Sequence, residues 1–163
     1  MFQKIIVVLV AVTLLATPAF SEEQVTPEQR FKQSIEAIQS GIKSIDPETL
    51  AAWIENERDF ILVDVREANE VEALQIQAED SMAVPRGVIE VKLSRKIKDL
   101  DTKLVLYCLK GDRGMLATKA LTDIGYTNAY NLDGGILNWI KEGRKVSNMF
   151  GSFEMKDYVS NFK

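Results

Sequence analysis

Short apolar runs alternate with helix-like segments along the middle of this chain, and this alternation constrains the fold more than any other feature. The runs are too short for helices, and residues 60–65 and 104–108 are rich in β-branched or aromatic side chains, as in buried strands. Strands that alternate with helices through short connections pair in parallel, with helices on both faces of the sheet. We therefore expect an open parallel α/β fold. Its strands are predicted at residues 60–65, 81–85, 104–108 and 128–132.

Residues 22–44 precede the main domain and have the pattern of an amphipathic helix. The stretch Thr26-Pro27-Glu28-Gln29 combines a hydroxyl side chain, a proline and an acidic residue, which is typical of a helix start. Apolar residues then recur at helical spacing. We predict that this helix packs on the main domain, residues 45–145, with docking of a partner protein as the alternative. The apolar positions are Phe31, Ile35, Ile38 and Ile42.

The last segment, residues 146–163, is apolar and aromatic. Large exposed apolar patches are rare in proteins, so we expect this tail to dock on the main domain. The alternative is that the tail forms a surface for another protein. Its large apolar residues include Met149, Phe150, Phe153, Tyr158 and Phe162.

Residues 1–21 have the organisation of a secretory signal peptide. Lys4 supplies a positive charge, an apolar region runs from Ile5 to Leu15, and small residues follow at Ala19 and Ser21, as in export signals. The apolar region is shorter than the roughly 20 residues that a membrane-spanning helix requires. We expect cleavage after Ser21, or alternatively after Ala19. The mature protein would then be exported to the periplasm and have no stable membrane span.

Composition narrows the chemistry that is open to the mature protein. Removing residues 1–21 removes one lysine and no acidic residue, which changes the net charge from −4 to −5. This charge argues against nucleic acid as a partner, since phosphate contacts need a basic face. The chain has no histidine and a single cysteine. Catalysis by Cys–His or Ser–His–Asp arrangements is therefore excluded, and we expect no metal site.

The single cysteine, Cys108, lies where the strand at residues 104–108 is predicted to turn into a helix. In open parallel sheets, ligands bind in the crevice at this kind of junction. Free N–H groups and the positive end of the helix dipole stabilise a thiolate there. The loop that follows is polar and carries Lys110 and Arg113, unlike the surroundings of an inert buried thiol. We predict that Cys108 reacts as a thiolate.

Five short stretches of the main domain are informative through their order and spacing. They are Leu62–Glu67, Val84–Gly87, Cys108–Arg113, Gly125-Tyr126, and Leu132–Gly135 followed by Trp139. No single stretch is specific, but in this order and spacing they resemble the rhodanese family of sulfurtransferase domains. The resemblance covers residues 45–142. It implies a parallel five-stranded sheet with helices on both faces, in agreement with the pattern of strands and helices.

The resemblance also implies nucleophilic covalent catalysis by Cys108. A donor such as thiosulfate would give its outer sulfur to the cysteine, and cyanide or a thiol would remove it from the resulting persulfide. Backbone amides would stabilise the sulfur, and glycine would let the backbone approach it. Arg113 and Lys110 would attract an anionic donor, while Asp112 would lie at the helix start and face away. The expected active loop is Leu109, Lys110, Gly111, Asp112, Arg113 and Gly114.

Asp64 and Arg66 match the family's motif at the end of the first buried strand. By resemblance, Asp64 would hold the loop structure and Arg66 would form a structural ion pair. We expect a structural role for both rather than direct catalysis. Residues 76–80 depart from the family, many members of which have a Gly-His-Ile-Pro-Gly stretch there. This departure leaves the donor preference open, but not the fold.

Three alternatives to a sulfurtransferase differ in their chemistry. Four residues separate Cys108 from Arg113, and the resemblance associates this length with sulfur, whereas related phosphatases use a longer loop for an oxyanion. A thiol oxidoreductase would need a second, resolving cysteine. A non-catalytic carrier that delivers sulfur to a partner protein stays open. We expect a small sulfur-containing anion and a thiol acceptor as partners, with a protein acceptor as the alternative, and no cofactor.

Overall fold

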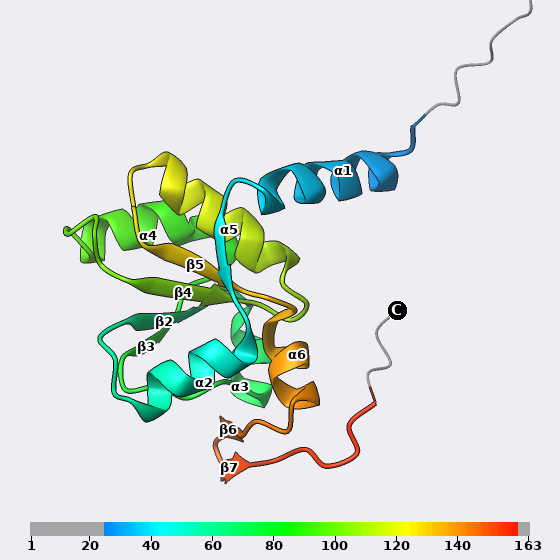
Figure 1. Cartoon of the computed structure of the whole chain (residues 1–163), viewed down its shortest axis with the longest axis vertical. Helices are drawn as coiled ribbons and strands as arrows, with labels where there is room; N and C mark the ends of the chain where they lie inside the picture. The colour runs from blue at the N-terminus through cyan, green and yellow to red at the C-terminus, as the bar shows by residue number, and fades with distance from the viewer. Residues whose placement is uncertain (1–24, 160–163) are drawn as a thin grey trace, which may run out of the picture.

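A five-stranded parallel sheet forms the centre of the protein in the computed structural model, which describes residues 25–159 (Figure 1). The strand order is β1-β5-β4-β2-β3, and every neighbouring pair is parallel. This confirms the predicted open parallel sheet. The strands are β1 (Lys43–Ile45), β2 (Ile61–Asp64), β3 (Ser81–Ala83), β4 (Leu104–Tyr107) and β5 (Ala129–Leu132).

Helices cover both faces of the sheet, as the alternation of strands and helices predicts. One layer contains α4 and α5, and the other contains α2, α3 and α6 (Figure 1). A short 3-10 turn, η1, precedes α4. The bounds are α2 (Pro47–Glu55), α3 (Ala68–Ala73), η1 (Arg86–Val88), α4 (Ile89–Lys96), α5 (Asp112–Asp123) and α6 (Gly135–Lys141).

Each face of the sheet has its own buried apolar cluster, because successive side chains of a strand point to opposite faces. Leu62 and Val105 belong to the cluster under α2 and α6, whereas Val63 and Leu106 belong to the cluster under α4 and α5. All four side chains are at most 1% exposed. Burial on both faces is the reason that these strands read as continuous apolar runs in the sequence.

The carboxyl ends of the central strands meet at one edge of the sheet. The register places Asp64 of β2 beside Tyr107 of β4, and Leu106 of β4 beside Asn131 of β5. Cys108 is the next residue after β4 and therefore emerges at this edge, between two neighbouring strands. This is the strand–helix crevice in which open parallel sheets bind their ligands.

The edge strand β1 lies in a segment that the sequence pattern predicts to be helical. We expect a helix over residues 22–44, but α1 spans only Pro27–Gln39, and Lys43–Ile45 pairs in parallel with β5. Only Ile45 of this three-residue strand is buried, so no alternating pattern marks it. The predicted boundary between residues 44 and 45 therefore divides a strand of the sheet.

Helix α1 lies beside α5, outside the two helical layers (Figure 1). The Thr26 hydroxyl accepts a hydrogen bond from the Gln29 N–H, and the Gln29 side chain accepts one from the Thr26 N–H. This reciprocal capping box fixes the start of the helix. Ile35 and Ile38 are half-buried, while Phe31 is 48% exposed. The helix thus packs on the domain through only part of its apolar face.

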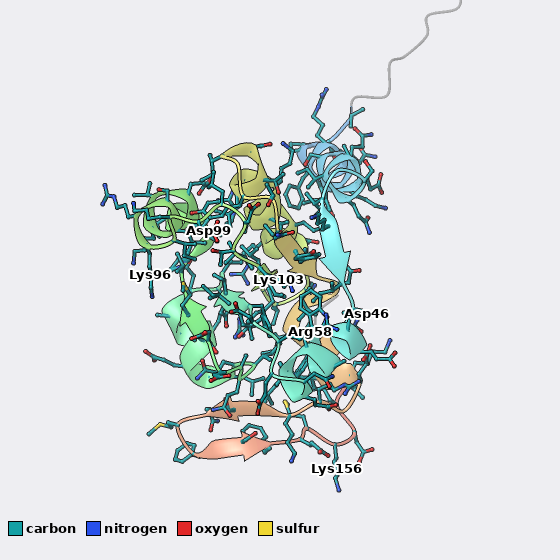
Figure 2. The ribbon with its side chains drawn as sticks, turned by 60° about the vertical axis from the view of Figure 1, so that its left-hand side comes forward. Asp46, Arg58, Lys96, Asp99, Lys103 and Lys156 are labelled. Atoms are coloured by element: carbon teal, nitrogen blue, oxygen red, sulfur yellow. The ribbon has the colours of Figure 1, made fainter. Side chains whose placement is uncertain are left out.

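The C-terminal segment forms an antiparallel hairpin of β6 (Val146–Asn148) and β7 (Gly151–Phe153). Val146 is buried in the α2/α6 cluster, and Met155 and Tyr158 pack against it. Figure 2 shows the hairpin at the border of the domain, with Lys156 on the segment that follows. Part of the tail therefore docks on the domain. At the tip, however, Met149 and Phe150 are each 87% exposed.

Residues 1–24 and 160–163 lie outside the described residues, and the predicted signal peptide falls among them. Within residues 25–159, none of the helices combines the length and the apolar character that crossing a membrane requires.

Candidate active site around Cys108

The side chain of Cys108 lies at the bottom of the loop that joins β4 to α5. It is 2% exposed and belongs to the apolar cluster under α4 and α5. Its sulfur accepts a hydrogen bond from the Gly111 N–H, with a donor–acceptor distance of 3.2 Å. The sulfur is therefore held by the backbone of its own loop.

Helix α5 begins within this loop, at Asp112, and Gly111 is its N-cap residue. Gly111 has a φ of 110°, which glycine adopts without steric cost. No side chain caps this helix, so the sulfur of Cys108 lies at a helix start where backbone N–H groups and the positive dipole end are available.

The other residues of the predicted loop differ in burial. Leu109 is half-buried and packs against the α2/α6 cluster, Lys110 is exposed, and Gly114 is buried. Asp112 is half-buried and is the first residue of α5. An acidic residue in a first helical turn interacts favourably with the helix dipole, which is the structural role expected for Asp112.

Helix α6 holds the first part of the loop through its N-terminal N–H groups. The Ile136 N–H donates to the carbonyl of Cys108 at 2.9 Å, and the Leu137 N–H donates to that of Leu109 at 3.1 Å. These donors have no partner inside their own helix, because the first N–H groups of a helix never do. These two hydrogen bonds give partners to the N–H groups of α6 and to the carbonyls of the loop, and they fix the backbone at Cys108.

Asp64 and Arg66 form a buried ion pair at the end of β2. Arg66 donates from Nε to Asp64 Oδ1 at 2.9 Å and from Nη2 to Oδ2 at 2.5 Å, and both residues are 3% exposed. Burial alone would lower the pKa of Arg66, but the hydrogen bonds and charge of Asp64 more than offset this and raise it. Arg66 Nη2 also donates to the Leu74 carbonyl at 2.6 Å, which fastens the end of α3.

Tyr107 lies beside this ion pair. Its hydroxyl accepts a hydrogen bond from the Ile76 N–H at 3.2 Å, and the Arg66 guanidinium lies 5.6 Å from the centre of its ring. Burial first, and then the charge of Asp64, raise the pKa of Tyr107 far above its ordinary value. The phenol is therefore neutral, and it supports the chain immediately before Cys108.

A second ion pair, Glu70–Arg113, joins α3 to the first turn of α5. Arg113 Nη1 and Nη2 each donate to one oxygen of the Glu70 carboxylate at 2.7 Å. The side chain of Arg113 is 35% exposed and that of Glu70 is 26% exposed. The hydrogen bond from Arg113 is the main cause that lowers the pKa of Glu70, and the bond to Glu70 likewise raises the pKa of Arg113. Arg113 also interacts electrostatically with Cys108.

The sequence did not single out Glu70 as part of this site. Its local signal is its position three residues after Glu67, where it accepts a hydrogen bond from the Glu67 N–H as part of a capping box. That pattern predicts a helix start but not a partner 43 residues away. Only the parallel pairing of β2 with β4 brings α3 next to the loop that carries Arg113.

Residues 76–80, which depart from the family pattern, run from Tyr107 to the beginning of β2. Ile76 is buried beside Tyr107. The Asp80 carbonyl accepts a hydrogen bond from the Leu62 N–H, at the beginning of β2 rather than at its carboxyl end. The departure therefore begins beside the residue before Cys108 and ends at the opposite edge of the sheet.

No group of three or more histidine, cysteine or acidic side chains within residues 25–159 is arranged to hold a metal ion. What the arrangement provides is a single buried sulfur, backbone donors at an open helix start, and two guanidinium–carboxylate pairs.

Comparison with known proteins assigns this arrangement to a family. A model of the rhodanese-like domain matches residues 46–142. A sulfurtransferase of Allochromatium vinosum is 33% identical over 105 residues, which cover 64% of this chain and 94% of that protein. A probable adenylyltransferase/sulfurtransferase of Mycobacterium tuberculosis is 30% identical over 99 residues, which cover 61% of this chain but only 25% of that protein.

The fold agrees with this assignment. The solution structure of a polysulfide-sulfur transferase homodimer from Wolinella succinogenes superposes with a TM-score of 0.63 at 23% identity, over 82% of this chain and 94% of that one. The matched family model covers more than half of the chain and includes Cys108, both ion pairs and four of the five sheet strands. This chain therefore belongs to the rhodanese-like family of sulfurtransferases.

Proposed function

We propose that this protein moves sulfane sulfur from a small anionic donor to a thiol acceptor through a persulfide on Cys108. The observation that supports this most is the sulfur of Cys108, 3.2 Å from the Gly111 N–H at the uncapped start of α5. Backbone donors and the positive end of a helix dipole favour a negatively charged sulfur. They favour it both as a thiolate, which is the nucleophile, and later as a persulfide anion.

The reaction has two displacement steps. In the first, the thiolate of Cys108 attacks the outer sulfur of the donor, so that a new S–S bond forms while the S–S bond of the donor breaks. The remainder of the donor leaves with the electron pair, as sulfite when the donor is thiosulfate. In the second step, an acceptor thiolate or cyanide takes the outer sulfur and Cys108 leaves as a thiolate. Splitting the transfer in this way is covalent catalysis.

The charged residues of the loop have separate roles in this proposal. Lys110 adds positive charge to the loop, and Arg113 can bind an anionic donor only in competition with the Glu70 carboxylate. The buried pair of Asp64 and Arg66 keeps the end of β2 and the end of α3 in place, so that the wall beside Cys108 does not move. These two residues position the loop and do not touch the donor.

The persulfide can be tested by intact mass. After incubation with thiosulfate, the wild-type protein should gain the mass of one sulfur atom and lose it again with cyanide. Cys108→Ser should show no gain, because the serine hydroxyl is not ionised and does not attack sulfur at neutral pH. Urea unfolding of the variant serves as its control, since a serine can accept the same Gly111 N–H. A mass gain that persists in Cys108→Ser would contradict the proposal.

Delivery of sulfur to a partner protein is a second candidate function. It is favoured by the exposed tip of the C-terminal hairpin, where Met149 and Phe150 are each 87% exposed. Slow turnover with small thiols, together with a partner that no longer binds after deletion of residues 149–163, would support a carrier. Fast turnover with small thiols and no stable partner would support the enzyme.

Export to the periplasm is part of the same proposal and rests on residues 1–21. N-terminal sequencing of the protein recovered from the periplasmic fraction should start after Ser21, or after Ala19. An intact Met1 in membrane-associated protein would overturn it.

A further inference from the structure

Six charged side chains on the loop of Cys108 and on the segments bonded beside it balance one another. Arg66 is bonded to Asp64, Arg113 is bonded to Glu70, and the loop itself carries one further cation and one further anion, at Lys110 and Asp112. The formal charges of these six groups cancel. Ionisation of Cys108 then leaves the site with a net negative charge, which a donor must approach.

Glu70 determines how much of the Arg113 charge a donor can use. Its two oxygens accept from both terminal nitrogens of Arg113 at 2.7 Å, which is the fork-to-fork geometry that guanidinium groups also use for other planar or tetrahedral anions. The Glu67 N–H holds the same carboxylate at 3.2 Å. A donor anion must therefore compete with a carboxylate that is already in place.

A doubly charged donor is disfavoured by this arrangement. Thiosulfate brings two negative charges to a site whose six formal charges already cancel, and its sulfonate oxygens must compete with Glu70 for the Arg113 guanidinium. A donor with one negative charge meets about half of the repulsion, because the interaction energy is proportional to the product of the charges. The geometry points to Glu70 as a specificity-determining residue that selects sulfane donors with a single negative charge, such as organic thiosulfonates or persulfides, over dianions.

This inference rests on the proposed persulfide mechanism and names the class of donor for it. Two donors test it because they undergo the same bond cleavage with different charge. Thiosulfate, S–SO3²⁻, transfers its outer sulfur to the Cys108 thiolate and releases sulfite. Methanethiosulfonate, CH3SO2S⁻, transfers its outer sulfur in the same way and releases methanesulfinate. In each case one S–S bond forms at Sγ, one breaks, and the leaving group takes the electron pair.

The experiment measures the rate of persulfide formation, by quenching and intact mass, for both donors and for three forms of the full chain. They are the wild type, Glu70→Gln and Glu72→Gln. Glutamine at residue 70 keeps the shape and the capping-box position but removes the charge. Glu72→Gln removes the same charge from an exposed position on the same helix, and controls for the net charge of the protein.

We expect Glu70→Gln to raise the ratio of the thiosulfate rate to the methanethiosulfonate rate by roughly tenfold, as expected for one uncompensated charge near a half-exposed site. Added salt should accelerate thiosulfate charging of the wild type, because screening weakens the repulsion, and this acceleration should be lost in Glu70→Gln. Glu72→Gln should behave as the wild type in both respects.

An unchanged donor ratio in Glu70→Gln would overturn the inference, and so would equal slowing with both donors, which a merely structural role predicts. The rates with each donor are first corrected for its reaction with free mercaptoethanol. The inference is also overturned if the wild type then forms the persulfide faster with thiosulfate than with methanethiosulfonate. In these outcomes the persulfide still forms, so the proposed function survives. If neither donor charges the wild type, the proposed function itself fails.

Discussion

Gly135, the first residue of α6, packs closely against the backbone of the loop that carries Cys108. Its φ is 59°, and a Cβ built there would overlap the carbonyl oxygen of Cys108 and lie 2.8 Å from that of Leu109. A side chain at this position would push α6 away from the loop and break the hydrogen bonds from Ile136 and Leu137. The glycine is therefore required by close packing as well as by its backbone conformation.

Gly135→Ala should lower both the stability of the fold and the rate of persulfide formation. Gly143→Ala is the control for the backbone conformation alone. Gly143 has a φ of 72°, but a Cβ added there would have no atom within 4 Å, so its substitution costs only the left-handed conformation, about 1–2 kcal/mol. We expect Gly135→Ala to exceed that loss by at least about 1 kcal/mol in urea unfolding, because backbone atoms must also shift. Equal losses in the two variants would show that the loop does not press against α6.

The sequence was a good guide to single residues whose role follows from local chemistry. Cys108, with glycines and cations in the next residues, marks a strand-to-helix junction without any knowledge of the fold. Glu70 and Tyr107 could not be found in that way. Their partners, Arg113 and the Ile76 N–H, are distant in the sequence, and a carboxylate or a phenol alone does not reveal which segment will lie beside it.

Among the elements, α2 has a start that can be tested by pH. Asp46 (Figure 2) is its N-cap, and its carboxylate accepts a hydrogen bond from the Thr49 N–H at 2.7 Å. The hydrogen bonds to Thr49 lower the pKa of Asp46 below its ordinary value of 3.8. Because the folded state holds the proton less tightly than the unfolded state, the charge stabilises the fold above pH 3.8, and this contribution is lost as the pH falls through the folded pKa.

Asp46→Ala should therefore cost about 1 kcal/mol at pH 7, the usual loss for a helix cap, whereas Asp46→Asn keeps the cap and should cost less. The difference between wild type and Asp46→Asn should shrink as the pH is lowered from 7 to 3, because the aspartate becomes neutral as well. Urea unfolding at several pH values measures both effects. A gap between wild type and Asp46→Asn that widens toward acid would contradict the assigned role.

Elements were predicted well where burial leaves a pattern and poorly where it does not. The strands β2 and β4 are buried on both faces and read as apolar runs. β1 was missed because two of its three residues are exposed. Its strand conformation is set by hydrogen bonding to β5, which exists only in the folded sheet.

At the scale of the whole molecule, the structural unit is larger than the stretch that matches the family. The match covers residues 46–142, but β1 completes the sheet before it, and β6 supplies a core residue after it. The Ser147 N–H donates to the Gln75 carbonyl at 2.9 Å, and the Gln75 N–H donates in return at 2.8 Å. The C-terminal segment is therefore tied to the chain that follows α3, the helix of Glu70.

Truncation after Lys145 should consequently destabilise the whole domain and not merely remove a tail. It removes Val146, which is 1% exposed, and uncovers the core surface under Met155 and Tyr158. We expect a loss of about 2–5 kcal/mol in urea unfolding, comparable to the loss of a large core side chain. Two point variants compare a buried with an exposed apolar side chain of the hairpin. Val146→Ala should cost about 1–2 kcal/mol. Met149→Ala, at the exposed tip, should stay within about 0.5 kcal/mol of the wild type. If the truncated protein were as stable as the full chain, the hairpin would be an appendage, and its contact with Gln75 would have no bearing on the position of α3.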